Sequence, residues 1–164
     1  DRYELVGGCF NPNEDENKSF ATRIGVPLSR VYSSFDVLVE EELKLPKEER
    51  MEVISVLTPN FLHYPMAKKL LESGFNVICE KPLTTTYKEA LELEALQKEK
   101  QTVFAVTYTY TGYPMVRQMK DMIKKGVLGT IQKVDLQYYQ GWINPVIHSS
   151  EKRSKVWRLS LIHI

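Results

Sequence analysis

Short apolar runs alternate with amphipathic stretches along the centre of the chain. Residues 53–57 are mostly β-branched and aliphatic, which predicts a strand buried on both faces. The turn at 58–60 ends this run, because proline lacks an amide donor and Asn favours a turn. Apolar residues at helical spacing then lead to Gly74, a suitable residue just beyond a helix, and residues 76–79 form a second apolar run. The pattern over 53–84 predicts a right-handed parallel strand–helix–strand unit.

The same alternation extends to both sides of this unit. It predicts strands at 3–10, 31–32 and 102–107 and helices at 15–24, 36–43, 87–100 and 115–125. On the 15–24 helix, Phe20, Ala21 and Ile24 are expected to face inward. The fold class is therefore α/β, with an incomplete, Rossmann-like, doubly wound parallel sheet. Ligands of such sheets bind at the carboxyl ends of the strands, so the turns at 58–60 and 80–82 are candidate site segments.

The last part of the chain has a different pattern. Residues 130–140 alternate between apolar and polar side chains, which predicts a half-exposed strand of an antiparallel sheet. We expect this strand to open a second, α+β domain, with residues 1–126 forming the first domain and 127–158 the start of the second. The final residues, 159–164, read LSLIHI, which a common sequencing adapter encodes when read in frame. We interpret them as a non-native tail, the alternative being a genuine apolar strand.

Composition limits the classes of function. The chain has 164 residues, of which 43% are hydrophobic and 26% charged, and its net charge is +1. This balance gives no electrostatic reason to expect nucleic acid or an anionic membrane as a partner. No apolar run approaches the roughly 20 residues of a membrane span. The two cysteines, Cys9 and Cys79, have no metal or redox spacing, so we predict buried thiols, a cytoplasmic location and no metal site.

The two candidate turns carry a paired motif. The first reads Thr58-Pro59-Asn60-Phe61-Leu62-His63, and one helix later the second reads Glu80-Lys81-Pro82-Leu83. Together, at this spacing and at strand ends, they resemble the signature of the Gfo/Idh/MocA oxidoreductases, the glucose-fructose oxidoreductase and inositol dehydrogenase type. The resemblance runs from the opening strand to Trp157-Arg158.

The resemblance implies a function and a catalytic residue. It implies an NAD(P)-dependent enzyme that moves a hydride between nicotinamide and a hydroxyl-bearing carbon of a sugar, cyclitol or related polyol. Lys81 is then the catalytic residue, because a lysine at a strand tip can hydrogen-bond the substrate hydroxyl that loses its proton. Glu80 would orient Lys81, and the resemblance suggests a cis Lys81-Pro82 bond that aims it. A surface Glu–Lys pair is the plainer alternative.

The resemblance also implies cofactor contacts. Thr58, Pro59 and Asn60 would contact the nicotinamide ribose and pyrophosphate, and Glu80, Lys81 and Pro82 would complete that side of the cleft. His63 would line the same cleft, or else be satisfied locally as a residue at a helix N-terminus.

Further contacts are expected outside the paired motif. Asn11 follows the 3–10 strand, at the position where family members contact the adenosine ribose. Because Asn11 is neutral and has no adjoining arginine, the choice between NAD and NADP stays open. The alternative for Asn11 is a simple turn. Tyr108 and Tyr110 are candidate substrate contacts, with aromatic packing at a domain junction equally open.

Other interpretations lead to different tests. Tyr64 and Lys68 match the Y-x-x-x-K spacing of short-chain dehydrogenases, but they follow the first turn directly and lack an upstream catalytic serine. A non-catalytic dinucleotide-binding sensor or scaffold would keep the turns without the chemistry. No Gly-rich GxGxxG turn is present, so we expect an internal, inactive fragment of a longer enzyme that forms homo-oligomers.

Overall fold

The computed structural model describes residues 3–139, 141, 144 and 148. It divides into two compact units, Asp1–Thr107 and Tyr108–Ile164, and each is described by itself. The predicted domain boundary at residue 126 remains a prediction. No helix among the described residues combines the length and the apolar composition that a membrane crossing needs.

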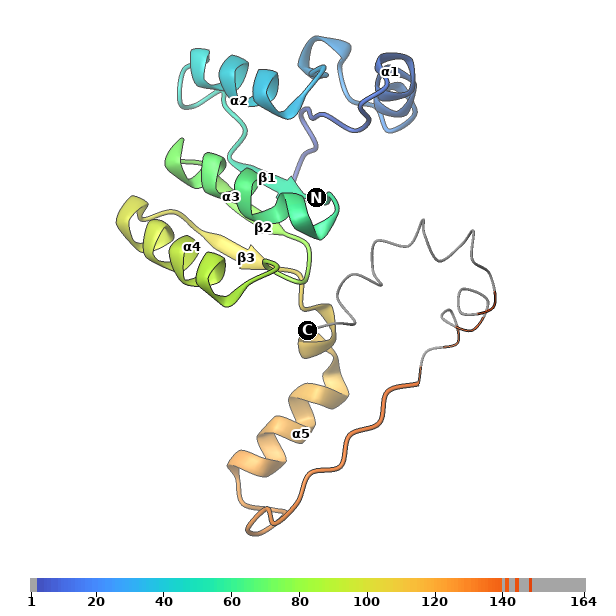
Figure 1. Ribbon diagram of the computed structural model, residues 1–164, viewed down its shortest axis with the longest axis vertical. Helices are drawn as coiled ribbons and strands as arrows, with labels where there is room; N and C mark the ends of the chain where they lie inside the picture. The colour runs from blue at the N-terminus through green and yellow to red at the C-terminus, as the bar shows by residue number, and fades with distance from the viewer. Residues whose placement is uncertain (1–2, 140, 142–143, 145–147, 149–164) are drawn as a thin grey trace. The chain divides into compact units, whose positions relative to one another are not determined.

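The first unit is built around a parallel sheet. Its strands are β1 (Val53–Val56), β2 (Asn76–Cys79) and β3 (Phe104–Val106), hydrogen-bonded in the order β1-β2-β3. Val56 pairs with Cys79 and Cys79 with Val106, so the three strands end level with one another. The helices are α1 (Glu14–Arg23), α2 (Phe35–Lys44), α3 (His63–Glu72) and α4 (Tyr87–Lys100), with short 3-10 turns η1 (Leu28–Arg30) and η2 (Asn60–Leu62). The α/β, Rossmann-like prediction is confirmed (Figure 1).

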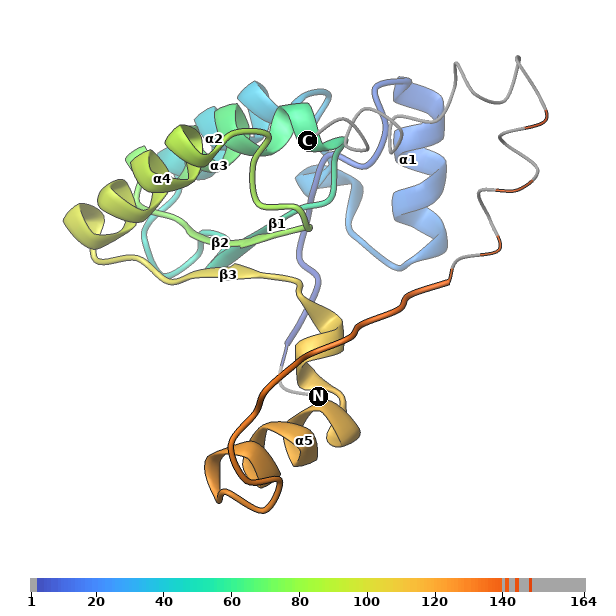
Figure 2. The ribbon, with the colours of Figure 1, turned by 60° about the horizontal axis from the view of Figure 1, so that its bottom comes forward.

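Helices α3 and α4 pack on each other over one face of the sheet (Figure 2). The core lies between them and the strands, and its fully buried side chains include Ala67, Leu70, Leu71, Val77 and Leu93. On β1, Ile54 and Val56 point into this core while Val53 and Ser55 are exposed. The expectation that β1 is buried on both faces is therefore wrong for the described residues, because the alternate side chains of a strand face opposite sides and helices pack on one of them.

The local chemistry explains where helices begin and end. Thr86 caps α4 in a capping box: its hydroxyl accepts from the Glu89 amide, and the Glu89 carboxylate accepts from the Thr86 amide. At the start of α2, the Ser34 side chain accepts a hydrogen bond from Val37 N. Gly74, at φ +81°, follows α3 in the left-handed conformation that its position was predicted to need.

The N-terminal strand prediction needs correction. Residues 3–10 and 31–32 contain only a parallel bridge between Gly8 and Val31 instead of a paired strand. Gly8 N donates to Arg30 O at 3.0 Å and Tyr32 N to Gly8 O at 3.0 Å, so the two segments touch at one point. Alternating apolar residues favour extension, but a strand also requires a continuous neighbour.

The predicted inward face of α1 is right for Ala21 and wrong for Phe20 and Ile24. Asn17 and Ala21 are buried, whereas Phe20 and Ile24 are more than a third exposed. The Asn17 side chain accepts from Phe10 N at 2.8 Å and donates to Tyr32 O at 2.7 Å. A buried amide with both functions satisfied replaces the apolar contact that periodicity predicted.

The second unit contains η3 (Thr109–Gly112) and α5 (Pro114–Lys124). Four apolar residues of α5 recur at the spacing that predicts an inward face, and this holds only in part: Val116 and Met122 are half-buried, but Met119 and Ile123 are about half exposed. Residues 131–139 form no strand, because no described segment pairs with them, so the predicted antiparallel strand is wrong over these residues. Gln140 and residues 149–164, including the predicted tail, lie outside the described residues.

Candidate active site

The two motif turns lie side by side at the carboxyl end of the sheet. Glu80 N donates to Val56 O at 2.9 Å, and Thr107 N donates to Cys79 O at 3.0 Å, which continues the ladder just past the three strands. The turn at 58–60 therefore follows β1 beside the turn at 80–82 after β2. This edge is where parallel sheets of this class bind ligands.

Asn60 carries an unused acceptor at this edge. Its side chain is only 3% exposed, and its Oδ1 has no hydrogen-bond partner among the described residues. Thr58 and Pro59 before it are half-buried, and Thr58 Oγ1 donates to Met66 Sδ at 3.5 Å. Buried oxygens without a partner are rare, and a hydroxyl-rich ligand such as a ribose would supply the missing donor. These residues therefore fit the cofactor that the motif implies.

Glu80 is held on two sides. Its Oε1 accepts from Thr107 Oγ1 at 2.9 Å and its Oε2 from Lys81 N at 2.9 Å. Partial burial works to raise the pKa of Glu80, but these hydrogen bonds and the Lys81 charge outweigh burial and leave the pKa below its ordinary value. Glu80 is thus an anion that joins the loop after β2 to the end of β3.

Lys81 projects from this braced loop. Its side chain is 50% exposed, and its Nζ lies 3.6 Å from Glu80 Oε2. The Lys81-Pro82 bond is cis, as the resemblance suggested. A lysine that is ion-paired at one side and open at the other can present its amine to a ligand at the strand ends.

His63 takes its contacts from the backbone of both turns. The ring is 1% exposed; Nδ1 lies 2.7 Å from Pro82 O and Nε2 lies 2.8 Å from Thr58 O. Direct contact between this ring and a cofactor stays a prediction. What the structure adds is that both nitrogens already face carbonyl oxygens of the two motif turns.

Asn11 is part of a tight turn before α1. Its Oδ1 accepts from Asn13 N at 2.8 Å, and its Nδ2 donates to Glu16 Oε2 at 2.7 Å. Asn13 in turn caps α1 through Glu16 N. The turn expected as the alternative is present, with a carboxylate from the first helical turn beside it, and the ribose contact stays a prediction.

Tyr108 and Tyr110 belong to the second unit. Both are more than half exposed, and the Tyr110 and Tyr138 hydroxyls lie 2.9 Å apart. This hydrogen bond is the main cause of the raised pKa of Tyr110. Their role as substrate contacts stays a prediction.

The short-chain alternative finds no support in the geometry of Tyr64. Its hydroxyl donates a hydrogen bond to Glu92 Oε2 at 2.5 Å and accepts one from Lys68 Nζ at 3.4 Å. These groups line a cleft of about 270 Å³ between α3 and α4. The hydrogen bond to Glu92 raises the pKa of Tyr64, and the lysine only partly opposes it. A catalytic tyrosine of that class needs a lowered pKa, so this pair is better explained as a contact between two helices.

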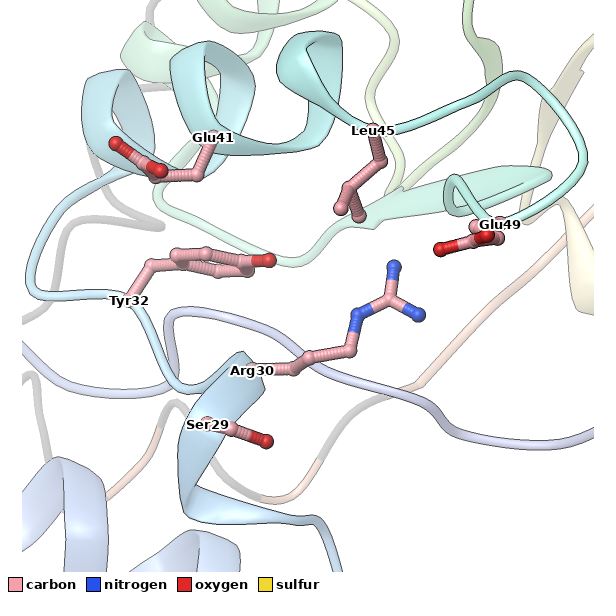
Figure 3. Close-up of a pocket in the computed structure, with 6 residues that line it drawn as sticks. All are labelled: Ser29, Arg30, Tyr32, Glu41, Leu45 and Glu49. Atoms are coloured by element: carbon pink, nitrogen blue, oxygen red, sulfur yellow. The ribbon is translucent and has the colours of Figure 1, made fainter.

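A hollow of about 670 Å³ lies away from the strand ends and is shown in Figure 3. Its lining includes Arg30 and Tyr32, which sit beside the buried carboxylate of Glu42. Arg30 Nη2 donates to both Glu42 oxygens at 2.6 Å, Tyr32 Oη donates to Oε1 at 2.5 Å and Met51 N to Oε2 at 2.7 Å. Arg30 and Tyr32 are thus already paired with Glu42, and among the described side chains that line the hollow the remaining charges are the carboxylates of Glu41 and Glu49. The described residues also contain no cluster of His, Cys, Asp or Glu able to hold a metal ion.

Sequence reasoning missed Asn17 and Thr107 as residues that fix the strand ends. The signal for Asn17 was a polar side chain four residues before Ala21, on the buried side of a helix. The only sequence signal for Thr107 was its place at the end of an apolar run. Its hydroxyl reaches Glu80 because β3 pairs with β2, and the sequence does not show which strands pair.

Comparisons with known proteins agree with this geometry. Residues 1–108 match the model of an oxidoreductase family with an NAD-binding Rossmann fold. An uncharacterized oxidoreductase of Bacillus subtilis, YfiI, is 36% identical over 157 residues, which are 96% of this chain and 39% of that protein. Levoglucosan dehydrogenase of Pseudarthrobacter phenanthrenivorans is 35% identical over 92 residues, 56% of this chain and 24% of the relative.

A solved structure gives the same result. An inositol dehydrogenase homolog of Azotobacter vinelandii, complexed with NADH and myo-inositol, superposes with a TM-score of 0.84 and 33% identity, over 95% of this chain and 39% of that one. The chain thus spans about two fifths of the length of this structure and of the Bacillus protein.

Proposed function

Because the chain belongs to the Gfo/Idh/MocA family of oxidoreductases, with an NAD-binding Rossmann fold, we propose that it forms the cofactor side of an NAD(P)-dependent dehydrogenase. The observation that carries the proposal is the placement of the two motif turns at the level ends of adjacent parallel strands. The substrate class is a sugar, cyclitol or related polyol with an oxidisable hydroxyl. One relative acts on levoglucosan by its name, and a structural neighbour holds myo-inositol, which supports this class.

Each motif residue has a separate task in this proposal. The nicotinamide cofactor, when bound, supplies hydride chemistry. Thr58, Pro59 and Asn60 bind its ribose and pyrophosphate side, with the partnerless Asn60 Oδ1 accepting from a ribose hydroxyl. Lys81 binds the substrate hydroxyl; during oxidation its neutral amine form takes up the hydroxyl proton as hydride leaves the adjacent carbon, and in the reverse direction its ammonium form returns that proton. Glu80 keeps Lys81 oriented, and Asn11, through its turn, meets the adenosine ribose.

The surroundings of the site set further expectations. We propose that Tyr108 and Tyr110 contact the substrate and that the complete enzyme is a homo-oligomer in the cytoplasm, a reducing environment that suits the free thiols of Cys9 and Cys79 in this chain. The chain by itself is expected to turn over no substrate.

The experiment uses a protein of the relatives' length that carries this chain, assayed with NAD, NADP and a panel of cyclitols and sugars. Lys81→Met removes the amine and keeps most of the side-chain volume. We expect kcat to fall about a hundredfold or more while NADH binding, followed by fluorescence, stays within about twofold. Lys98→Met is the matched control, because that lysine pairs with Glu94 on the exposed face of α4, away from the two motif turns.

Three outcomes would decide against the proposal. Unchanged turnover in Lys81→Met would remove the catalytic role from Lys81. Cofactor binding without turnover of any polyol, in parent and variant alike, would favour a dinucleotide-binding sensor or scaffold. Tyr64→Phe should leave activity intact, and its loss would favour the short-chain mechanism instead.

A further inference from the structure

His63 is a buried polar side chain whose ring spans two backbone segments. The residue is only 1% exposed. Nδ1 faces Pro82 O at 2.7 Å and Nε2 faces Thr58 O at 2.8 Å. The described residues give the ring no carboxylate partner, so these two carbonyls are its polar environment. The ring therefore connects the end of β1 to the loop that follows β2.

The connected loop is the one that carries Lys81. Pro82 follows Lys81 directly, so fixing Pro82 O fixes the C-terminal side of the lysine. On the N-terminal side, the Glu80 carboxylate accepts a hydrogen bond from Thr107 Oγ1, just past the end of β3. Lys81 is thus held between two anchors that reach opposite neighbouring strands, whereas within the described part of the chain its side chain makes one loose ion pair, with Glu80.

We propose that His63 is a positioning residue, which sets the placement of the Lys81 amine by bridging Thr58 O and Pro82 O. This inference rests on the function proposed above and goes beyond it, because it assigns the histidine to the backbone of the site instead of to the cofactor. A displacement of about 1 Å at a reacting group can lower a rate by about a hundredfold, so a small backbone shift at Pro82 matters for catalysis.

The two ends of the bridge can be separated by substitution. Carbonyl oxygens only accept, so a neutral ring donates from one nitrogen and an imidazolium from both. An Asn side chain places its Nδ2 close to the position of ring Nδ1, and a Gln side chain places its Nε2 close to ring Nε2. His63→Asn therefore keeps a donor for Pro82 O, His63→Gln keeps one for Thr58 O, and His63→Phe keeps the ring without either.

The first measurement follows the loop itself in the 164-residue chain, without cofactor. Backbone amide signals of Lys81 and Leu83 flank Pro82 and are read from ¹H–¹⁵N NMR spectra. We expect His63→Gln and His63→Phe to move these signals and to speed exchange of the Lys81 amide about tenfold, with a smaller effect in His63→Asn. If His63→Asn and His63→Gln changed the Lys81 and Leu83 amide signals equally, the proposed bridge to Pro82 O would be wrong.

The second measurement follows catalysis in the full-length protein. We expect kcat to fall in His63→Gln at least about fivefold further than in His63→Asn, with the KM for cofactor changed by less than about twofold in both. A residue with only a structural role would lower the amount of folded enzyme and leave kcat per active site unchanged. A KM effect that exceeds the kcat effect would return His63 to direct cofactor contact and contradict the proposal.

The two proposals fail in different ways. If the enzyme assignment is wrong, the loop signals still separate Asn from Gln while no polyol is turned over. If the bridge is wrong, Lys81→Met still lowers kcat about a hundredfold or more, while the loop signals of His63→Asn and His63→Gln coincide.

Discussion

Cys79 ends β2 one residue before the Glu80-Lys81-Pro82 turn, and its thiol is fully buried. Burial first, and the nearby Glu80 charge second, raise the pKa of Cys79 to about 11. Only the thiolate reacts, so we expect Cys79 to label with a maleimide at pH 7 at least about a hundredfold more slowly than an unperturbed cysteine.

Cys9 provides the internal comparison for that measurement. It is half-buried, and burial raises its pKa less far. Mass spectrometry of Cys9→Ser and Cys79→Ser chains assigns each labelling rate. Rapid labelling of Cys79 in folded Cys9→Ser would show that the end of β2 opens readily, against the packing described here.

The sequence motif predicted the roles of some residues. The roles of others follow only from the order in which the strands pair. Lys81 and Asn60 could be located from the sequence, because a turn after an apolar run marks a strand end. The two-sided contacts of His63 could not, because they depend on β1 lying next to β2 and on the backbone path through Pro82. The same holds for Asn17, which joins Phe10 N to Tyr32 O in the N-terminal part of the unit.

At the scale of elements, the turn after α3 offers a test of local sequence control. Gly74 has φ +81°, and no heavy atom lies within 4 Å of the place where a Cβ would stand. The cost of Gly74→Ala is therefore conformational alone, and we expect the free energy of unfolding to fall by about 1 kcal/mol. Urea denaturation measures the change.

Gly74→Asn is the matched variant for this turn, because Asn tolerates the left-handed region better than Ala. It should recover part of the loss. An alanine variant as stable as the parent would mean that the chain leaves α3 by another route.

Helices followed from the sequence more closely than strands did. The 87–100 helix has the predicted bounds, since a capping box and helix-forming residues act within one segment. The apolar 3–10 run and the alternating 130–140 run both favoured strands, but the first forms a single bridge and residues 131–139 have no paired neighbour among the described residues. Strand formation depends on a partner segment, which periodicity within one run cannot supply.

At the scale of the whole first unit, strand ends are fixed by polar side chains while the body of the sheet is held by apolar packing. His63 and Glu80 tie the ends of β1, β2 and β3 together, and Asn17 does the same for the Gly8–Val31 pair. This division places hydrogen-bonded polar groups at the carboxyl edge, where a cofactor would bind, and it makes the fold dependent on charged groups such as Glu80 and Glu42.

Acid stability tests that dependence. Burial works to raise the pKa of Glu42, but hydrogen bonds from Arg30, Tyr32 and Met51 N outweigh it and hold the pKa below its ordinary value. With a folded pKa below the unfolded one, the stabilisation is complete above the unfolded pKa and is lost as pH falls through the folded pKa. We therefore expect the free energy of unfolding to be level near neutral pH and to decline below about pH 4.5, the ordinary carboxyl range.

Glu42→Gln separates this carboxylate from the other acidic groups. It leaves Arg30 facing a neutral amide, so we expect a loss of roughly 3 kcal/mol at pH 7 and a shallower decline in acid than in the parent. Glu14→Gln is the control, because its ion pair with Lys18 is exposed on both sides and should contribute little. Urea denaturation followed by circular dichroism between pH 7 and pH 2 gives both quantities. An acid slope in Glu42→Gln as steep as in the parent would place the acid sensitivity elsewhere, with Glu80 at the strand ends as the next group to substitute.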